Sequence, residues 1–374
     1  MILLLLLLGG DADRPTAVTR VRILVGNGTE IAEGAILIQD GKIAEIGKDV
    51  KVPEGAKVVD ARGWTAMPGM VHAASRLGLA RGGDAGGVGS TPHHRAADEI
   101  NPSLDVYDRF ARAGFTAAAV HPGGVTVSGV GALLKPVGGD RAAMLVDADA
   151  FLRVRMRTGT PAKDALRQAL DGARKAIEAQ KKDAAKKPDE KTAPVARFLN
   201  GELPGLVEVS SPAEILHFWQ VLDGFAEFKP RVVLLASSDA WKAAEELGRR
   251  KAAVILRPEL VFAPFTRDRV NPAAELARAG VTIAFAPPDD RDESLEGHLF
   301  RVMELVKHGL PRETALRALA TAPAELLGAD KRLGSLEKGK DADLLLFDGD
   351  PLSAKARLRR VFLGGREIYA EDVR

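Results

Sequence analysis

The pattern of apolar runs changes twice along this chain, and those changes limit the folds that it can adopt. The N-terminal part contains short β-branched or alternating runs separated by Gly- and Asp-containing turns: residues 18–25, 34–39, 42–46 and 57–60. The chain closes on three similar runs: residues 342–347, 360–363 and 366–369. Each run has the length and alternation of a β-strand. We therefore expect β structure at both ends of the chain.

The sequence between these ends has a different pattern of apolar residues. After Met67-Pro68-Gly69, strand-like runs alternate with helix-like stretches. The strand-like runs are residues 115–120, 206–209, 232–235, 253–256 and 281–285, and the helix-like stretches include residues 105–113, 212–223 and 240–249. Strands that alternate with helices over this length predict a parallel sheet closed into a barrel. The predicted fold class is α/β: a (β/α)8 TIM-type barrel with a small composite β-sandwich domain formed from the N- and C-terminal segments.

The same pattern predicts the domain organisation. We expect a hydrophobic N-terminal segment over residues 1–17, a composite β-sandwich from residues 18–67 and 340–374, and the barrel over residues 68–339. A Lys/Ala-rich insertion near residues 175–194 interrupts the barrel pattern. Its composition favours a helix that Pro188 should end. We expect a solvated surface arm there, with a lysine-dependent partner site as the alternative.

Composition narrows the classes of function. Hydrophobic residues make up 46% of the 374 residues, which provides for a large core. The 53 basic and 51 acidic residues are mixed along the chain, so we expect neither nucleic acid nor an anionic membrane as partner. The absence of cysteine excludes disulfides, thiolate zinc sites and a cysteine nucleophile, and it leaves localisation open.

The N-terminus carries one targeting-like feature. Residues 2–8 are a continuous apolar run, followed by Gly9-Gly10 and a polar stretch. The run is far shorter than the roughly 20 residues of a membrane span. It also lacks a basic segment before it and an Ala-x-Ala cleavage site. We interpret it as a degenerate export signal and favour an exported or periplasmic protein over a cytoplasmic one; the alternative is an apolar tail with no address function.

Two blocks of sequence at opposite ends of the chain carry further information. The first is GAILIQDGKIAEIG followed by VVDARGWTAMPGMVHAASRLGL, and the second is GLPRETALRALATAPAELLGADKRLGSLEKGKDADLLLFDGDPL. Together they resemble the amidohydrolase superfamily, particularly its imidazolonepropionase-like branch. The resemblance implies a barrel with a sandwich domain, and hydrolysis of non-peptide C–N bonds at a divalent metal such as zinc.

The metal positions that the resemblance implies are poorly filled. The family motif PG-x-x-D-x-H-x-H aligns with Pro68 to Arg76, which puts Ala74 and Arg76 at the two histidine positions. A methyl group cannot bind a cation, and a protonated guanidinium repels one. His72 replaces the aspartate of the motif and shares a strand face with the first ligand position. It is a candidate for a catalytic or metal-binding role, against the alternative of a hydrogen-bonded, partly buried histidine.

The later family positions are also altered. Those for mid-barrel histidines fall on Ser210 and on Ser237 or its neighbour Ser238, whose hydroxyls are poor zinc ligands. The aspartate expected after the last barrel strand falls on Pro288. Asp289 is one residue further on and can reach a pocket only if the turn is remodelled; the alternative is a solvated loop carboxylate. We therefore expect no bound metal or other cofactor.

The remaining histidines and glycines give few further candidates. His121 ends the run 115–120, so we expect it at the barrel mouth, where it is a third candidate for catalysis or simply lines a pocket. We expect His217, His298 and His308 in helices on the outside of the barrel. The glycine-rich stretches 82–90 and 127–131 lack the lysine of a phosphate loop, and we interpret both as flexible loops at the mouth.

Three hypotheses follow from these residues. The first is a pseudoenzyme that keeps the amidohydrolase scaffold and binds a small molecule at the barrel mouth, or another protein. The second is an active hydrolase with a non-standard or metal-free site around His72, His121 and Asp289. The third is a non-catalytic subunit that pairs with an active homologue. Both homo- and hetero-oligomers are compatible with the sequence.

Overall fold

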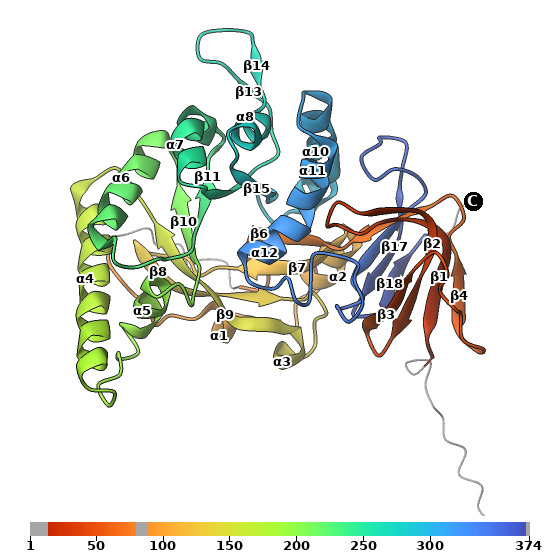
Figure 1. Ribbon diagram of the computed structural model, residues 1–374, viewed down its shortest axis with the longest axis horizontal. Coiled ribbons are helices and arrows are strands. Elements are labelled where there is room, and N and C mark those ends of the chain that lie inside the picture. The colour runs from red at the N-terminus through yellow and green to blue at the C-terminus, as the bar shows by residue number, and fades with distance from the viewer. Residues whose placement is uncertain (1–13, 80–87, 372–374) are drawn as a thin grey trace, which may run out of the picture. The chain divides into compact units, whose positions relative to one another are not determined.

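The computed structural model describes residues 14–79 and 88–371 (Figure 1). The apolar run interpreted as an export signal lies outside the described residues, as does most of the glycine-rich stretch 82–90. The chain splits into two compact units: Met1–Gly69 with Lys331–Arg374, and Met70–Asp330. No helix in the described part of the chain has both the length and the apolar character that crossing a membrane requires.

The first unit is built on one mixed sheet to which both ends of the chain contribute. Its strands are β1 (Thr16–Leu24), β2 (Glu30–Gln39), β3 (Lys42–Gly47), β4 (Lys57–Asp60), β5 (Thr65–Pro68), β16 (Leu344–Phe347), β17 (Leu358–Leu363) and β18 (Arg366–Ala370). The order is β18-β17-β16-β5-β1-β2-β3, with β4 beside β1. Antiparallel pairing of β5 with β16 joins the two ends. The β-rich ends expected from the sequence therefore pair within one sheet.

This sheet folds over on itself around a single core. Side chains from both ends of the strand order meet there, among them Ile36 of β2, Ile43 of β3 and Phe362 of β17, each 1% exposed or less. The β2–β3 turn also meets the C-terminal segment, because Ala342 N–H donates to the Gly41 carbonyl at 2.9 Å. A Cβ on Gly365 would lie 2.9 Å from Gly41 Cα, so the close approach of these backbones requires glycine.

The second unit contains an eight-stranded sheet in sequence order. Its strands are β6 (Met70–Ser75), β7 (Phe115–Val120), β8 (Val127–Leu134), β9 (Leu145–Arg155), β10 (Gly205–Val209), β11 (Val232–Ala236), β12 (Ala253–Leu256) and β15 (Thr282–Phe285). The end strands β15 and β6 approach each other, but no ladder joins them within the described residues. The sheet is a nearly closed barrel, which confirms the predicted fold class.

One strand departs from the parallel arrangement expected for the barrel. β8 runs antiparallel to both β7 and β9. Only residues 121–126 connect β7 to β8, which is too short for the crossover that a parallel pair needs. The prediction of a flexible mouth loop over residues 127–131 was wrong, since they lie in this buried strand. Gly129 has φ 125° and an added Cβ would lie 2.3 Å from the His94 carbonyl oxygen, so tight packing explains this glycine.

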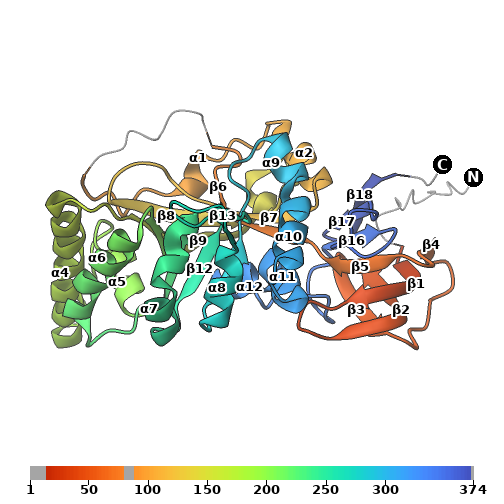
Figure 2. The ribbon, with the colours of Figure 1, turned by 90° about the horizontal axis from the view of Figure 1, so that it is seen from above.

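Helices accompany the barrel strands, as Figure 2 shows from above. They are α1 (Ala96–Glu99), α2 (Val106–Arg112), α3 (Arg141–Met144), α4 (Thr160–Lys182), α5 (Ala193–Leu199), α6 (Pro212–Leu222), α7 (Ala244–Arg249), α8 (Pro272–Arg278), α9 (Asp292–Glu296), α10 (His298–Lys307), α11 (Arg312–Leu319) and α12 (Thr321–Leu326). The short turns η2 (Asp223–Phe225) and η3 (Ser238–Ala243) follow α6 and β11, and a small hairpin, β13 (Val261–Phe262) with β14 (Arg269–Val270), follows β12.

The Lys/Ala-rich stretch differs from its prediction. Its first part, up to Lys182, is the second half of α4, and Ile177 within it is buried with other apolar residues of that helix. The lysines of this part are exposed, as predicted for a solvated surface, and only Ile177 departs from that prediction. The helix also ends before Pro188, because Asp183 turns the chain: its carboxylate accepts a hydrogen bond from Ala185 N–H at 3.1 Å.

Candidate functional site

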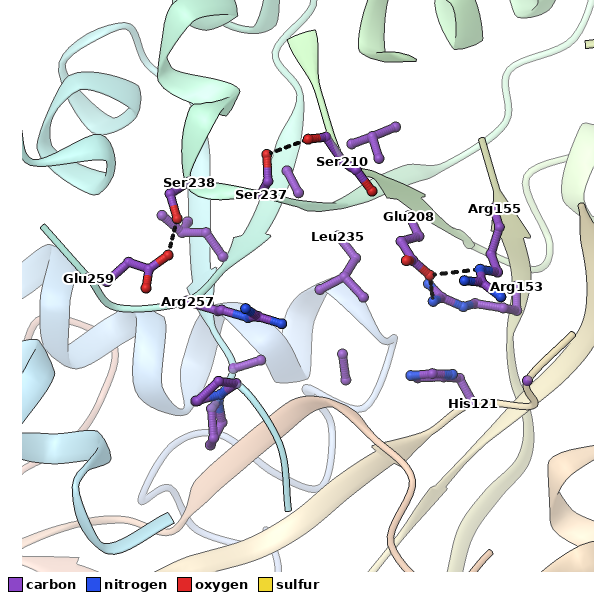
Figure 3. A pocket seen from close by; sticks show the side chains of 18 of the residues that line it. His121, Arg153, Arg155, Glu208, Ser210, Leu235, Ser237, Ser238, Arg257 and Glu259 are labelled. Atoms are coloured by element: carbon purple, nitrogen blue, oxygen red, sulfur yellow. Dashed lines mark hydrogen bonds and ion pairs between the residues drawn. The ribbon is translucent and has the colours of Figure 1, made fainter. Parts of the chain in front are cut away.

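A cavity of about 590 Å³ opens among the C-terminal ends of the barrel strands (Figure 3). Its lining comes from most of the strands in turn, and its polar and charged members are His121, Arg153, Arg155, Glu208, Ser210, Ser237, Ser238, Arg257 and Glu259. In barrel proteins this edge carries the ligand-binding groups, because the loops that follow the strands vary without disturbing the core. A volume of this size suits a small molecule.

The positions where the family resemblance implies metal ligands do not form a metal site. Ala74 and Pro288 line the cavity but offer no donor atom. Ser237 Oγ donates to the Ser210 carbonyl at 3.0 Å, and Ser210 N–H is held by the Glu214 carboxylate at 2.5 Å. Over residues 14–79 and 88–371, no three histidine or carboxylate side chains come together as a possible metal site. The residues present therefore do not fit a divalent ion.

A carboxylate that the sequence did not single out closes the seam between β15 and β6. Asp290, after β15, accepts hydrogen bonds from Ser75 Oγ and from Arg76 N–H, each at 2.8 Å. His72 Nε2 of β6 lies 3.2 Å from the same carboxylate. Burial alone would raise the pKa of the Asp290 carboxyl, but His72 and the two donors lower it below its ordinary value. Asp290 is thus an ionised group that ties the last barrel strand to the first.

His72 belongs to an aromatic cluster inside the barrel unit. Its ring is fully buried and stacks on Phe110 with centroids 5.6 Å apart. Phe115 lies between His72 and His298, at centroid distances of 5.5 Å and 5.4 Å. Burial lowers the pKa of His298 to about 3, so that ring is neutral. His298 lies in a helix, α10, as predicted, and its side chain is buried there.

The other two catalytic candidates lie in different surroundings. His121 lines the cavity, and burial together with the charge of Arg153 holds its pKa well below the ordinary value. Asp289 instead forms an ion pair with the exposed side chain of Arg291 at 2.6 Å, and that hydrogen-bonded pairing lowers the pKa of Asp289. His72, His121 and Asp289 therefore do not converge on one point.

The arginines of the cavity were not among the residues predicted from the sequence. Arg153, Arg155 and Arg157 follow one another at every second residue, which places them on one face of β9 and its continuation. All three contact the carboxylate of Glu208 on β10: Arg153 closely, Arg155 at 3.3 Å and Arg157 at 3.7 Å. The alternation LRVRMR in a strand was the signal, because charged side chains seldom face a barrel interior without a role.

Two further charged residues reach the cavity from the loop after β12. Glu259 accepts a close hydrogen bond from Ser238 Oγ. Arg257 extends its guanidinium into the cavity (Figure 3). Within the described part of the chain this guanidinium has no hydrogen-bond or ion-pair partner.

The barrel and the cavity at its mouth define an α/β-barrel protein, and part of its chain is similar to a known family. Residues 267–369 match the model of the amidohydrolase family. The amidohydrolase tasK of Hapsidospora irregularis is 39% identical over 75 residues, which are 19% of this chain and 8% of that protein. The chain therefore spans only a small fraction of this curated relative.

Solved structures share the fold over nearly the whole chain. An amidohydrolase from Thermotoga maritima MSB8 has a TM-score of 0.83 at 23% identity, covering 95% of this chain and 100% of that chain. A prolidase complexed with N-methylphosphonate-L-proline has a TM-score of 0.58 at 16% identity, covering 96% and 100%. Residues 267–369 are thus similar to the amidohydrolase family, and the solved structures share the fold of nearly the whole chain.

Proposed function

We propose that this protein is a pseudoenzyme of the amidohydrolase superfamily, which binds a small molecule at the barrel mouth without metal-assisted hydrolysis. One observation carries the proposal: the positions for metal ligands hold a methyl group, a guanidinium, two hydroxyls and a proline ring, at Ala74, Arg76, Ser210, Ser237 and Pro288. Catalytic divalent ions need several imidazole or carboxylate ligands to lower the pKa of a bound water.

The surroundings of Asp290 support the same conclusion. Its carboxylate already accepts hydrogen bonds from Ser75 and from the Arg76 backbone. A cation at this carboxylate would break the contacts that hold β15 beside β6. It would also lie near the Arg76 position, whose side chain is permanently positive.

Two finer assignments accompany the proposal. We assign the chain to the imidazolonepropionase-like branch on the strength of the N-terminal block and the turn GSLEKGKDADL. We also propose that the unit made from both chain ends is a composite β-sandwich domain. Its sheet folds around one core, which supports that description.

Metal-free hydrolysis is the weaker candidate. The one catalytic candidate that lines the cavity is His121, and its pKa lies well below the ordinary value through burial and the charge of Arg153. A general base works best with a pKa near the working pH, so this imidazole is poorly suited to activate water.

Metal content tests the proposal directly. We expect mass spectrometry of the purified protein to find no stoichiometric divalent ion, and a zinc titration to give no saturable heat. The double substitution Ala74→His with Arg76→His restores the first ligand pair, so it should gain measurable zinc affinity and serves as the positive control. One equivalent of a divalent ion in the wild-type protein, with hydrolysis of an amide or cyclic C–N substrate, would overturn the proposal.

A further inference from the structure

The guanidinium of Arg257 is the feature of the cavity that the proposed function leaves unexplained. It lies at the end of β12 and points into the cavity. Arginine is the side chain best shaped to hold a carboxylate or phosphate, because its planar fork donates two parallel hydrogen bonds. Within the described residues Arg257 has no such partner.

The cavity has carboxylates of its own, yet neither pairs with Arg257. Glu208 is held by the arginines of β9. Glu259 is held by the hydroxyl of Ser238, and no contact of ion-pair length joins it to Arg257. The described protein groups thus satisfy the carboxylates and leave the guanidinium open to a ligand.

The backbone also holds Arg257 in place. β12 pairs with β11 on one side and with β15 on the other, and its last residue, Leu256, pairs with Phe285. Pro258 follows Arg257 directly and restricts the backbone of both residues. A side chain on so fixed a backbone loses less freedom on binding, which favours affinity.

The electrostatic surroundings agree with an anionic ligand. Three guanidiniums and two carboxylates are among the lining groups, and the imidazole of His121 is kept neutral by burial and by the nearby positive charge of Arg153. An anion that enters this cavity therefore meets cationic groups on the β9 side and on the β12 side.

We propose that the barrel-mouth cavity binds a small molecule through a carboxylate or phosphate group seated on Arg257. This inference deepens the proposed function and rests on it, since it names the class of ligand for the same cavity.

Calorimetric titration of the full chain with two probes tests the inference. The probes are inorganic phosphate and succinate, each at constant ionic strength, and the comparison between them identifies the preferred anionic group. We expect saturable binding of at least one probe, weakened by added salt because screening reduces the attraction. The absence of saturable binding by both probes would overturn the inference.

Three variants locate the binding. Arg257→Gln should weaken affinity about 10-fold to 100-fold, the range for hydrogen bonds to a charged group, and Arg257→Lys should recover only part of it. Glu259→Gln removes a negative charge from the same cavity and should tighten binding a few-fold, an effect in the direction opposite to structural damage. Arg112→Gln is the matched control: an exposed arginine of α2 that is not part of the cavity lining.

The outcomes separate this inference from the proposed function. Equal affinity of the wild-type protein and of Arg257→Gln for the anionic probe would show that Arg257 does not bind the anion. Absence of anion binding together with absence of a bound metal would contradict this inference and leave the pseudoenzyme proposal standing. A stoichiometric metal in the wild-type protein would contradict the pseudoenzyme proposal whatever the anion titrations give.

Discussion

Two sides of the same barrel mouth use charge differently. At the seam, the Asp290 carboxylate is enclosed by donors from β6 and lies 3.2 Å from His72. On the opposite arc, from β9 to β12, arginines line an open cavity, and Arg257 has no partner within the described residues. The seam charges serve the closure of the barrel, whereas the arc keeps a cation available. Charged residues at the strand ends of one barrel can therefore stabilise the fold on one side of the mouth and remain available to a ligand on the other.

The largest expected effect is a loss of stability when Glu208 is replaced. It distinguishes Glu208, whose charge stabilises the fold, from Arg257, whose charge we propose to bind a ligand. Glu208→Gln removes the carboxylate that forms a close ion pair with Arg153, which is 3% exposed. Breaking a buried ion pair by removing one partner costs about 3–5 kcal/mol, and we expect the lower end because Glu208 is 25% exposed. Denaturant unfolding measures the loss, with the exposed Glu245→Gln as control. A loss no greater than the control's would show that solvent already screens this pair.

The seam should respond next most strongly. Asp290→Asn keeps one oxygen acceptor but removes the charge that Ser75, Arg76 N–H and His72 surround. Hydrogen bonds to a charged group contribute about 1.5–3 kcal/mol, so we expect a loss of about 2 kcal/mol in the free energy of unfolding. Asp289→Asn is the matched control, since its partner Arg291 is 81% exposed and the pair should contribute little. Equal losses in the two variants would contradict the closing role of Asp290.

The last expected effect is a slope of stability against pH, which is small over any single pH unit. Burial lowers the pKa of His298 from 6.5 to about 3 in the folded protein. Between these two pH values His298 is therefore protonated in the unfolded chain and neutral in the folded protein. The stability from this neutral ring is complete above pH 6.5 and is lost as the pH falls toward 3, by on the order of 1 kcal/mol per pH unit.

The variant His298→Phe should flatten this slope in denaturant unfolding followed from neutral to acidic pH. The exposed His308→Phe, at the end of α10, should leave the slope unchanged. An unaltered slope in His298→Phe would show that other groups cause the acid sensitivity. Asp290 should add a further loss at lower pH, because its folded pKa lies below the ordinary value and its stabilising charge disappears as the pH falls through that pKa.

Hydrophobic periodicity was sufficient to predict the barrel and the β-rich ends. The runs 115–120 and 253–256 coincide with β7 and β12, because short buried strands leave an unbroken apolar signal. The same signal failed for β8: Gly129 and Gly131 make that strand resemble a loop, and only the close approach of His94 and Phe151 explains them. Contacts of this kind with other segments cannot be predicted from the sequence of the strand alone.

The candidate site was harder to predict than the fold. The loss of histidines at Ala74 and Arg76 was visible by position. Which of the two adjacent aspartates turns inward could not be predicted, because that depends on the path of the turn, and in the structure it is Asp290 that accepts the hydrogen bond from Arg76 N–H. Arg257 was missed for a similar reason: whether an arginine at a strand end has a partner depends on side chains distant in sequence.

The antiparallel strand β8 has a consequence for the order of folding. β7, β8 and β9 form a meander whose contacts join residues close in sequence, whereas β15 and β6 must meet across some two hundred residues of chain. Local contacts require less loop-closure entropy and so form sooner. The barrel should therefore grow from this meander and close last at Asp290. Pulsed hydrogen exchange should then show that the amides of β8 and β9 become protected first. The amide of Arg76, which donates a hydrogen bond to the Asp290 carboxylate, should become protected later.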